Sequence, residues 1–145
     1  MPVTLDTQLA ARLRLSVARL ARMLRQHTPP DGDVTVSMLS ALASVERLGP
    51  LTLGELASVE RVQPPSMTRI VARLDGLGLV AREVDVLDRR VARVRLTPEG
   101  ARFLNRNRAR RNVFLAERMK GLTAEEVAVL EQALPVIEKL VEGER

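Results

Sequence analysis

The chain has 145 residues, of which 46% are hydrophobic and 28% charged, so its composition is that of a globular domain and excludes a disordered chain. It has no cysteine and one histidine, His27, which excludes disulfides, thiolate metal sites and multi-histidine sites. Its formal net charge is +5, and all basic residues except Lys120 and Lys139 are arginines, whose planar guanidinium binds phosphates and base edges. We therefore expect a protein without a metal or other cofactor, for which a nucleic-acid partner is permitted.

Other classes of protein are also disfavoured. No apolar run approaches the roughly 20 residues that a membrane helix needs, and Arg12, Arg14 and Arg19 interrupt the first apolar face, unlike a signal peptide. The chain contains no glycine-rich phosphate loop and no nucleophile–histidine–acid arrangement. We therefore expect a cytoplasmic protein that has no membrane partner and is not an enzyme.

The first part of the chain predicts two helices. The first covers residues 5–27, and its apolar stripe repeats every three or four residues: Leu5, Leu9, Leu13, Val17, Leu20 and Leu24. Turn-forming residues 28–33 end it. The second helix is predicted over Val36–Leu48, with Thr35 as its N-cap and Gly49 as part of its stop signal.

Two helices joined by a tight turn follow. The first is predicted over 53–60, because Thr52 and Glu55 have the spacing of a capping box. The second is predicted over 64–77 and ends at Gly78. Its inner face is apolar and consists of Met67, Ile70, Val71 and Leu74. This order is typical of a helix-turn-helix, although an ordinary helical hairpin with a solvated polar face would give the same pattern.

The pattern then changes to a β-hairpin. Residues 79–84 and 91–96 alternate between apolar and polar with a period of two and flank the polar segment 85–90. The hairpin tip carries Arg89 and Arg90, and arginine is suited to a narrow minor groove. Asp88 is unfavourable beside a phosphate, so we expect it to hold an arginine in place through a charge-assisted hydrogen bond.

Two further helices complete the chain. A long basic helix is predicted over 98–120, and Thr123 opens a last helix with a second capping box. The last helix has an apolar seam formed by Val127, Leu130, Leu134, Ile137 and Val141. Pro135 lacks a backbone donor, so we expect a kink or local break near 131–134.

These elements predict a fold that is mainly α with a small β-hairpin wing: a winged helix-turn-helix with helical dimerisation arms. We expect residues 35–97 to form the DNA-binding domain. Residues 1–34 and 98–145 form the helical dimerisation region, because their apolar faces exceed what the middle of the chain can cover and favour a symmetric dimer.

The combined pattern resembles the MarR family of bacterial winged helix-turn-helix regulators. The resemblance covers essentially the whole chain. Its most specific stretches are Leu53–Ala57, Pro65–Leu74, Gly78–Arg82, the wing residues Asp88–Arg90 and the segment Leu96–Gly100.

The resemblance implies a transcriptional regulator, which we expect to be a repressor, that binds double-stranded DNA as a homodimer on pseudo-palindromic operators. It also implies release by a small lipophilic or aromatic ligand. We assign DNA binding to eight residues: Gln63, Pro65, Ser66, Thr68, Arg69, Arg73, Arg89 and Arg90. Within this set, the recognition-helix residues face the major groove, and Arg89 or Arg90 enters the minor groove.

A ligand site is expected where the first two helices meet the winged domain and the long helix. Its expected lining is Leu20, Leu24, Met38, Leu42 and Phe103, with Arg106 placed to meet a carboxylate. Two alternatives remain: a constitutive DNA-binding regulator without a ligand, and a winged-helix protein-interaction module.

Two basic features have alternative interpretations. The arginines between 102 and 111 could contact phosphates, but we favour a solvated helix face paired with acids from the first or last helix. His27 stands at a helix end, where we expect it to interact with the helix dipole or solvent rather than a ligand.

Overall fold

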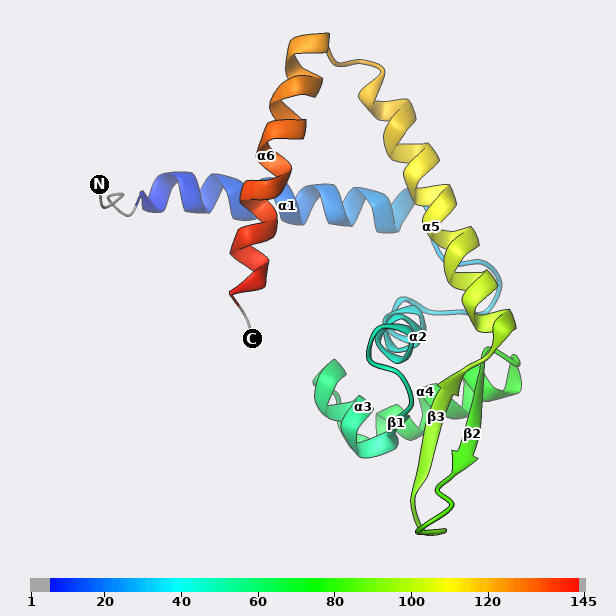
Figure 1. Cartoon of the computed structure of the whole chain (residues 1–145). Coiled ribbons are helices and arrows are strands. Elements are labelled where there is room, and N and C mark those ends of the chain that lie inside the picture. The colour runs from blue at the N-terminus through cyan, green and yellow to red at the C-terminus, as the bar shows by residue number, and fades with distance from the viewer. Residues whose placement is uncertain (1–5, 144–145) are drawn as a thin grey trace. The chain divides into compact units, whose positions relative to one another are not determined.

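The computed structural model describes residues 6–143, which form six helices and one small sheet (Figure 1). In chain order the elements are α1 (Thr7–His27), α2 (Val36–Leu48), β1 (Leu51–Thr52), α3 (Leu53–Glu60), α4 (Pro64–Gly76), β2 (Val80–Val84), β3 (Ala92–Leu96), α5 (Pro98–Met119) and α6 (Ala124–Glu142). The mainly α fold with a β-hairpin wing is therefore confirmed. Leu5, which begins the predicted stripe of the first helix, lies outside the described residues.

Packing divides the chain into two compact units, Met1–Arg111 and Asn112–Arg145, with the boundary inside α5. The division expected from the sequence, with a DNA-binding domain at 35–97, separates functions rather than packing units. It remains a prediction.

Local hydrogen bonds explain where the helices begin. The side chain of Asp6 accepts hydrogen bonds from the backbone N–H groups of Gln8 and Leu9 at 3.0 and 3.1 Å, which caps α1. Thr35 caps α2, and Thr123 forms the predicted capping box at the start of α6. The N-caps predicted at Thr35 and Thr123 are thus confirmed, whereas the cap at Asp6 was not predicted.

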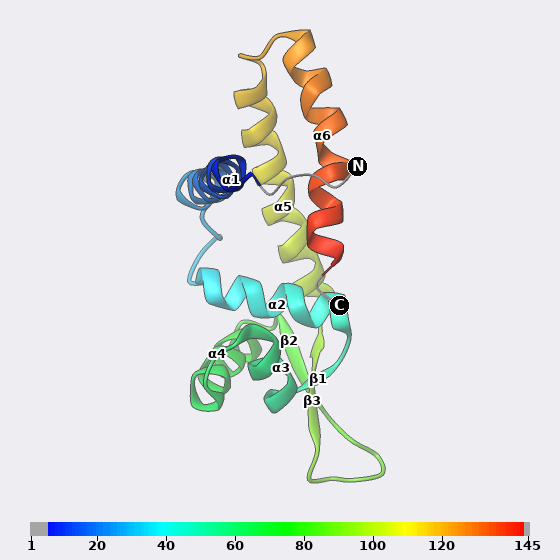
Figure 2. The same ribbon diagram turned by 90° about the vertical axis from the view of Figure 1, so that its left-hand side faces the viewer.

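The sheet has the strand order β1-β3-β2 and is antiparallel throughout. In the predicted hairpin, Val80 pairs with Leu96 and Val84 with Ala92. Strand β1 was not predicted, because its two residues are too few to show a period. The hairpin extends away from α2 as the wing (Figure 2).

The core of the first unit lies between α2, α3, α4 and the sheet. Met38, Leu42, Leu56, Met67 and Leu74 are fully buried there. The cluster also takes in Phe103 and Leu104 from the start of α5, so the core is not confined to residues 35–97. Helix α4 is therefore packed against this core through its buried face, which determines which of its faces is exposed.

Gly100 is needed where α5 begins. A Cβ atom at this position would lie 2.1 Å from the backbone oxygen of Leu79 and 2.8 Å from Cδ1 of Leu96. Thr97 joins the same segments, because its hydroxyl donates to the backbone oxygen of Gly78 at 2.7 Å. The long helix is thereby held close to the base of the wing.

The outer helices bury little within their own units. None of the described side chains of α1 or α6 is buried. Leu134 and Val141 of α6 are 54% and 67% exposed. The helix is continuous through Pro135, so the local break expected near 131–134 does not occur; proline removes one backbone donor, and the remaining hydrogen bonds maintain the helix.

Candidate nucleic-acid interface

The turn between α3 and α4 is fixed by backbone hydrogen bonds. Arg61 adopts a left-handed conformation with φ of 54°, and the N–H of Val62 donates to the oxygen of Ala57 at 3.0 Å. The oxygen of Gln63 then accepts from Ser66 and Met67, which starts α4. Helix α4 thus leaves the turn in a defined direction, and its first two residues, Pro64 and Pro65, are exposed.

The outer face of α4 carries the major-groove residues expected from the sequence. Met67, Val71 and Leu74 are buried beneath the helix. On the other side, Ser66 is half-buried. Five of the predicted DNA-binding residues are exposed: Gln63, Pro65, Thr68, Arg69 and Arg73. These side chains are brought onto one accessible face, which suits a groove of DNA.

Two of these side chains already have a protein partner. The hydroxyl of Thr68 donates to the backbone oxygen of Pro64 at 3.0 Å, so it offers DNA an acceptor rather than a donor. Nη2 of Arg73 donates to the backbone oxygen of Asp33 at 3.3 Å, which links α4 to the loop between α1 and α2.

The wing tip confirms the expected role of Asp88. Its Oδ1 accepts from Nε of Arg90 at 3.1 Å, and its Oδ2 accepts from Nη2 at 3.3 Å. The pKa of Asp88 is lowered by these side-chain hydrogen bonds and by the backbone N–H of Arg90. The side chain of Arg90 is nevertheless 91% exposed, so it is oriented and still accessible to DNA. Arg89 is also exposed.

A second acid at the wing was missed in the sequence analysis. Asp85 accepts from the N–H groups of Leu87 and Asp88 at 2.8 and 3.2 Å, and it forms an ion pair with Arg93 on β3. The hydrogen bond from Arg93 is the main reason why the pKa of Asp85 lies below its ordinary value. An aspartate at the start of a polar turn was a usable signal for this arrangement.

Another missed contact joins α2 to the helix-turn-helix. Glu60, at the end of α3, accepts from the hydroxyl of Ser40 at 2.7 Å and also from the hydroxyl of Ser44. No local pattern predicts this contact, because the partners are 16 and 20 residues apart in the chain. It helps to fix the turn that precedes the recognition helix.

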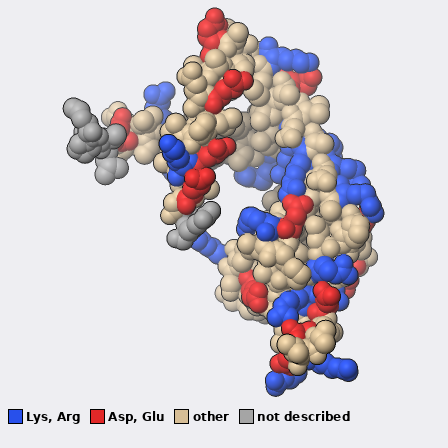
Figure 3. All heavy atoms as spheres, in the orientation of Figure 1, with Lys and Arg blue, Asp and Glu red and all other residues tan. Residues whose placement is uncertain are grey.

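The arginines between 102 and 111 are mainly paired within the first unit. Arg102 and Arg106 pair with Glu99 of the same helix, and Arg108 pairs with Glu46 of α2. Arg110 binds Asp31 at 2.5 Å. The solvated, paired face expected here is therefore present, but these acids come from α2, the α1–α2 loop and α5 itself rather than from the first or last helix. Figure 3 shows basic side chains along α5 and at the lower end, where the wing lies.

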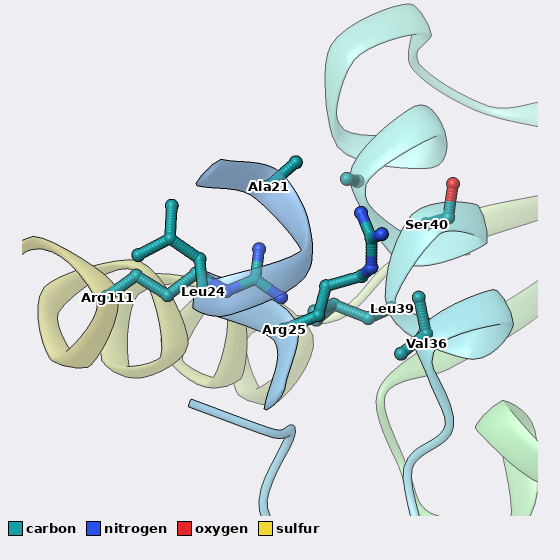
Figure 4. Close-up of a pocket in the computed structure, with 8 residues that line it drawn as sticks. Ala21, Leu24, Arg25, Val36, Leu39, Ser40 and Arg111 are labelled. Carbon is teal, nitrogen blue, oxygen red and sulfur yellow. The ribbon is translucent and has the colours of Figure 1, made fainter. Parts of the chain in front are cut away.

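A pocket of about 320 Å³ lies between α1, α2 and α5 within the first unit. Figure 4 shows the α1 and α2 residues on its two sides. Its lining consists of Ala21, Leu24, Arg25, Val36, Leu39, Ser40, Ala43 and Arg111. Nε of Arg111 is buried and has no hydrogen-bond acceptor among the described residues.

The predicted ligand residues are not all brought together. Leu24 lines this pocket, whereas Met38 and Leu42 are fully buried in the core and Phe103 is 8% exposed. Leu20 is 45% exposed on α1. Arg106 pairs with Glu99 and lies over the ring of Phe103, so its charge has a partner already. Arg25 and Arg111 are the basic residues of the pocket, and neither was predicted as a ligand residue.

Residues 6–143 contain no group of three or more histidine and acidic side chains that could hold a metal ion. Within the same range, no helix is both long and apolar enough to cross a membrane.

A recognition helix with an exposed basic and hydroxyl face, followed by a wing with an oriented arginine, defines a winged helix-turn-helix DNA-binding protein. Comparisons with known proteins specify the family. The model of the MarR family matches residues 34–92. A helix-turn-helix transcriptional regulator of Mycobacterium leprae is 39% identical over 137 residues, which cover 94% of this chain and 95% of the relative. The chain therefore belongs to the MarR family of DNA-binding transcriptional regulators, whose members are not enzymes.

Two further relatives agree with this assignment. The transcriptional repressor MdtR of Bacillus subtilis is 30% identical over 139 residues, covering 94% of this chain and 88% of the repressor. The crystal structure of a transcriptional regulator from Pseudomonas aeruginosa superposes with a TM-score of 0.82 at 37% identity, covering 97% of this chain and 98% of that one. Sequence and fold thus match over nearly the full length.

Proposed function

We propose that this protein is a homodimeric repressor that binds pseudo-palindromic operators and is released by a small lipophilic or aromatic acid. The repressor role is supported by the similarity to MdtR, which is named as a repressor. In this proposal residues 35–97 bind DNA, and residues 1–34 with 98–145 form the dimer.

The uncovered apolar faces of the outer helices support the dimer. Large apolar side chains remain exposed on α1 and α6, including Leu9 at 60% and Leu140 at 64%. Exposed apolar surface of this kind is stabilised when a second copy removes it from water. A symmetric dimer also presents two recognition helices, which bind half-sites about 34 Å apart, one turn of DNA.

The accessible face of α4 carries the DNA-binding proposal. Arg69 is assigned to a base edge, because it stands near the helix N-terminus and its guanidinium can bind O6 and N7 of guanine. Arg90 is assigned to the minor groove, where Asp88 holds it in an oriented state. Gln63, Pro65, Ser66, Thr68, Arg73 and Arg89 complete the proposed interface.

The pocket between α1, α2 and α5 supports release by a ligand. Its aliphatic side chains suit an apolar body, and Arg25 and Arg111 suit a carboxylate. The dimer would have two conformations that differ in the distance between its recognition helices. Such a ligand releases DNA only if it binds the conformation that does not fit DNA more tightly than the one that does. The alternative of a regulator without a ligand makes the opposite prediction, in which no acid alters DNA binding.

A gel-shift titration tests the DNA-binding part of the proposal. The probe is a duplex selected from randomised double-stranded DNA by the wild-type protein, titrated at several salt concentrations. Arg90→Ala is expected to weaken binding to many sequences and to make its salt dependence less steep, by about 0.9 in log–log terms for each phosphate that the protein no longer neutralises. If the salt dependence of binding is unchanged in Arg90→Ala, Arg90 does not belong to the DNA interface.

The ligand is tested with the same duplex. A panel of phenolic acids is expected to include compounds that raise the melting temperature of the protein and release it from the duplex. If no compound of the panel does either, the regulator without a ligand is the correct alternative.

A further inference from the structure

The wing tip carries an exposed apolar patch that neither the helix-turn-helix nor the arginines of the wing explain. Val86 and Leu87 are 94% and 98% exposed, the highest values for large apolar side chains in the part of the chain that the structure describes. Val84, on the adjoining strand, is 55% exposed. These three residues, the wing apolar patch, line one hollow of about 320 Å³ together with Glu83, Asp85 and Arg93.

The backbone beneath this patch is fixed. Asp85 donates its N–H to the oxygen of Val91 at 2.8 Å, and its carboxylate accepts from the N–H of Leu87 at 2.8 Å. Arg93 on the facing strand holds the same carboxylate. These bonds hold the backbone that carries Leu87, so a contact made by this exposed side chain requires little additional ordering of the backbone.

The acids near the patch are matched by arginines of the wing. Asp85 is paired with Arg93, and Glu83 faces Arg95 at 3.9 Å. Asp88 is occupied by Arg90. Figure 3 shows tan, red and blue atoms together at this end of the molecule. An anionic surface can thus approach the patch without meeting unpaired carboxylates, and Arg90 next to it attracts such a surface.

We propose that Leu87, supported by Val86, makes an apolar contact inside the minor groove that the wing enters. The inference rests on the proposed placement of the wing on DNA. The walls of the minor groove are formed by deoxyribose carbons, and proteins that bind this groove commonly insert apolar side chains beside their arginines. Leu87 adds affinity by leaving water, whereas Arg90 adds it through charge.

The two contributions differ in their dependence on salt. Removal of a basic side chain reduces the number of counterions released, but removal of an apolar side chain does not. Leu87→Ser is therefore expected to weaken binding to the selected duplex at least tenfold, because a leucine side chain is no longer buried, with an unchanged salt slope. Leu87→Met keeps an apolar side chain of similar size and is expected to restore the affinity.

The experiment measures dissociation constants for the selected duplex at five salt concentrations with full-length wild-type, Leu87→Ser, Leu87→Met and Arg90→Ala proteins. Leu48→Ser, which replaces another exposed leucine at the end of α2, is the matched control and is expected to bind like the wild type. Because Leu87 is almost fully exposed, both of its variants should keep the melting temperature of the wild type, which separates a DNA contact from a folding defect.

Each result has a defined meaning. Weaker binding of Leu87→Ser with an unchanged slope and recovery in Leu87→Met supports the proposal. If Arg90→Ala binds weakly and Leu87→Ser binds like the wild type, the apolar contact is wrong while the wing remains on DNA. If neither variant binds more weakly, the placement of the wing itself is wrong. Weak binding of Leu87→Ser that Leu87→Met does not restore also contradicts an apolar contact.

Discussion

Nη2 of Arg73, on the recognition helix α4, donates a hydrogen bond to the backbone oxygen of Asp33 at 3.3 Å. This bond ties α4 to the loop between α1 and α2. The same loop is held from α5, because Arg110 donates to the backbone oxygen of Pro29 at 2.7 Å. Arg73 therefore links α4 to this loop, in addition to the DNA contact that we propose for it.

Arg69 and Arg73 are expected to affect DNA binding differently. Arg69→Ala should cost about 1–3 kcal/mol on the selected operator and less on an unrelated duplex, because it removes a contact to a base edge. Arg73→Ala should weaken binding to both duplexes by similar factors. Fluorescence anisotropy with the two duplexes measures both effects. Equal effects of Arg69→Ala on the two duplexes would assign Arg69 to the phosphate backbone instead.

The wing is expected to keep its structure at pH values below the usual pKa range of an aspartate. The pKa values of Asp85 and Asp88 are lowered mainly by hydrogen bonds from Arg93 and Arg90, respectively. Their stabilisation is thus fully present above the ordinary pKa of 3.8 and is lost as the pH falls through the lowered values.

Amide chemical shifts of Leu87 and Asp88 measure this acid transition. They should stay constant from neutral pH down to about pH 4 and change only below it. In Asp85→Asn the side-chain oxygen can still accept from the N–H groups of Leu87 and Asp88. Asparagine does not titrate, so the part of the acid transition that is due to residue 85 should disappear. A wing that changes between about pH 5 and 6 would contradict the arginine pairing.

Dimerisation is expected to depend on α6. Leu134→Glu together with Val141→Glu places two charges on an exposed apolar seam and should convert the dimer to a monomer of 16.1 kDa. Deletion of residues 123–145 should give a monomer or an aggregate. Light scattering coupled to size exclusion measures the mass. Lys139→Glu, on the opposite side of the helix, is the control that should stay dimeric, and a dimer in the double variant would exclude this seam.

Gly100→Ala is expected to destabilise the fold by about 1–3 kcal/mol, because the added methyl group overlaps the backbone oxygen of Leu79 at 2.1 Å. The change in unfolding free energy is measured by chemical denaturation. Gly54→Ala is a matched control in a helix, where the added carbon meets no described atom within 4 Å, and it should be neutral or stabilising by about 0.4–1 kcal/mol. Equal stability of the two variants would contradict the close packing at Gly100.

Filling the pocket between α1, α2 and α5 should remove the response to a ligand without removing DNA binding. Ala21→Leu places a larger apolar side chain in the lining, so phenolic acids that release the wild-type protein should no longer do so. Gel shifts with and without the acid measure the response. Ala116→Leu, outside the lining, should respond normally. Release of Ala21→Leu at wild-type ligand concentrations would place the ligand elsewhere.

Local sequence patterns determined the elements of this protein. The apolar period of 64–77 and the alternation of 79–84 and 91–96 identified α4 and the hairpin, because side-chain direction follows directly from helical and extended backbone geometry. Capping at Thr35 and Thr123 located helix starts within a few residues. The acid–arginine pair at Asp88 and Arg90 was predictable for the same reason, since its partners are two residues apart.

Contacts between distant residues were decided only by the tertiary structure. Glu60 meets Ser40 and Ser44, and Arg73 meets the backbone of Asp33, through packing of separate helices that no local period encodes. Burial likewise placed Met38 in the core and Arg111 in the pocket lining, although both belong to helices of mixed apolar and polar character. A helical period shows which residues share a face, whereas the neighbouring elements determine whether that face becomes core, pocket or surface.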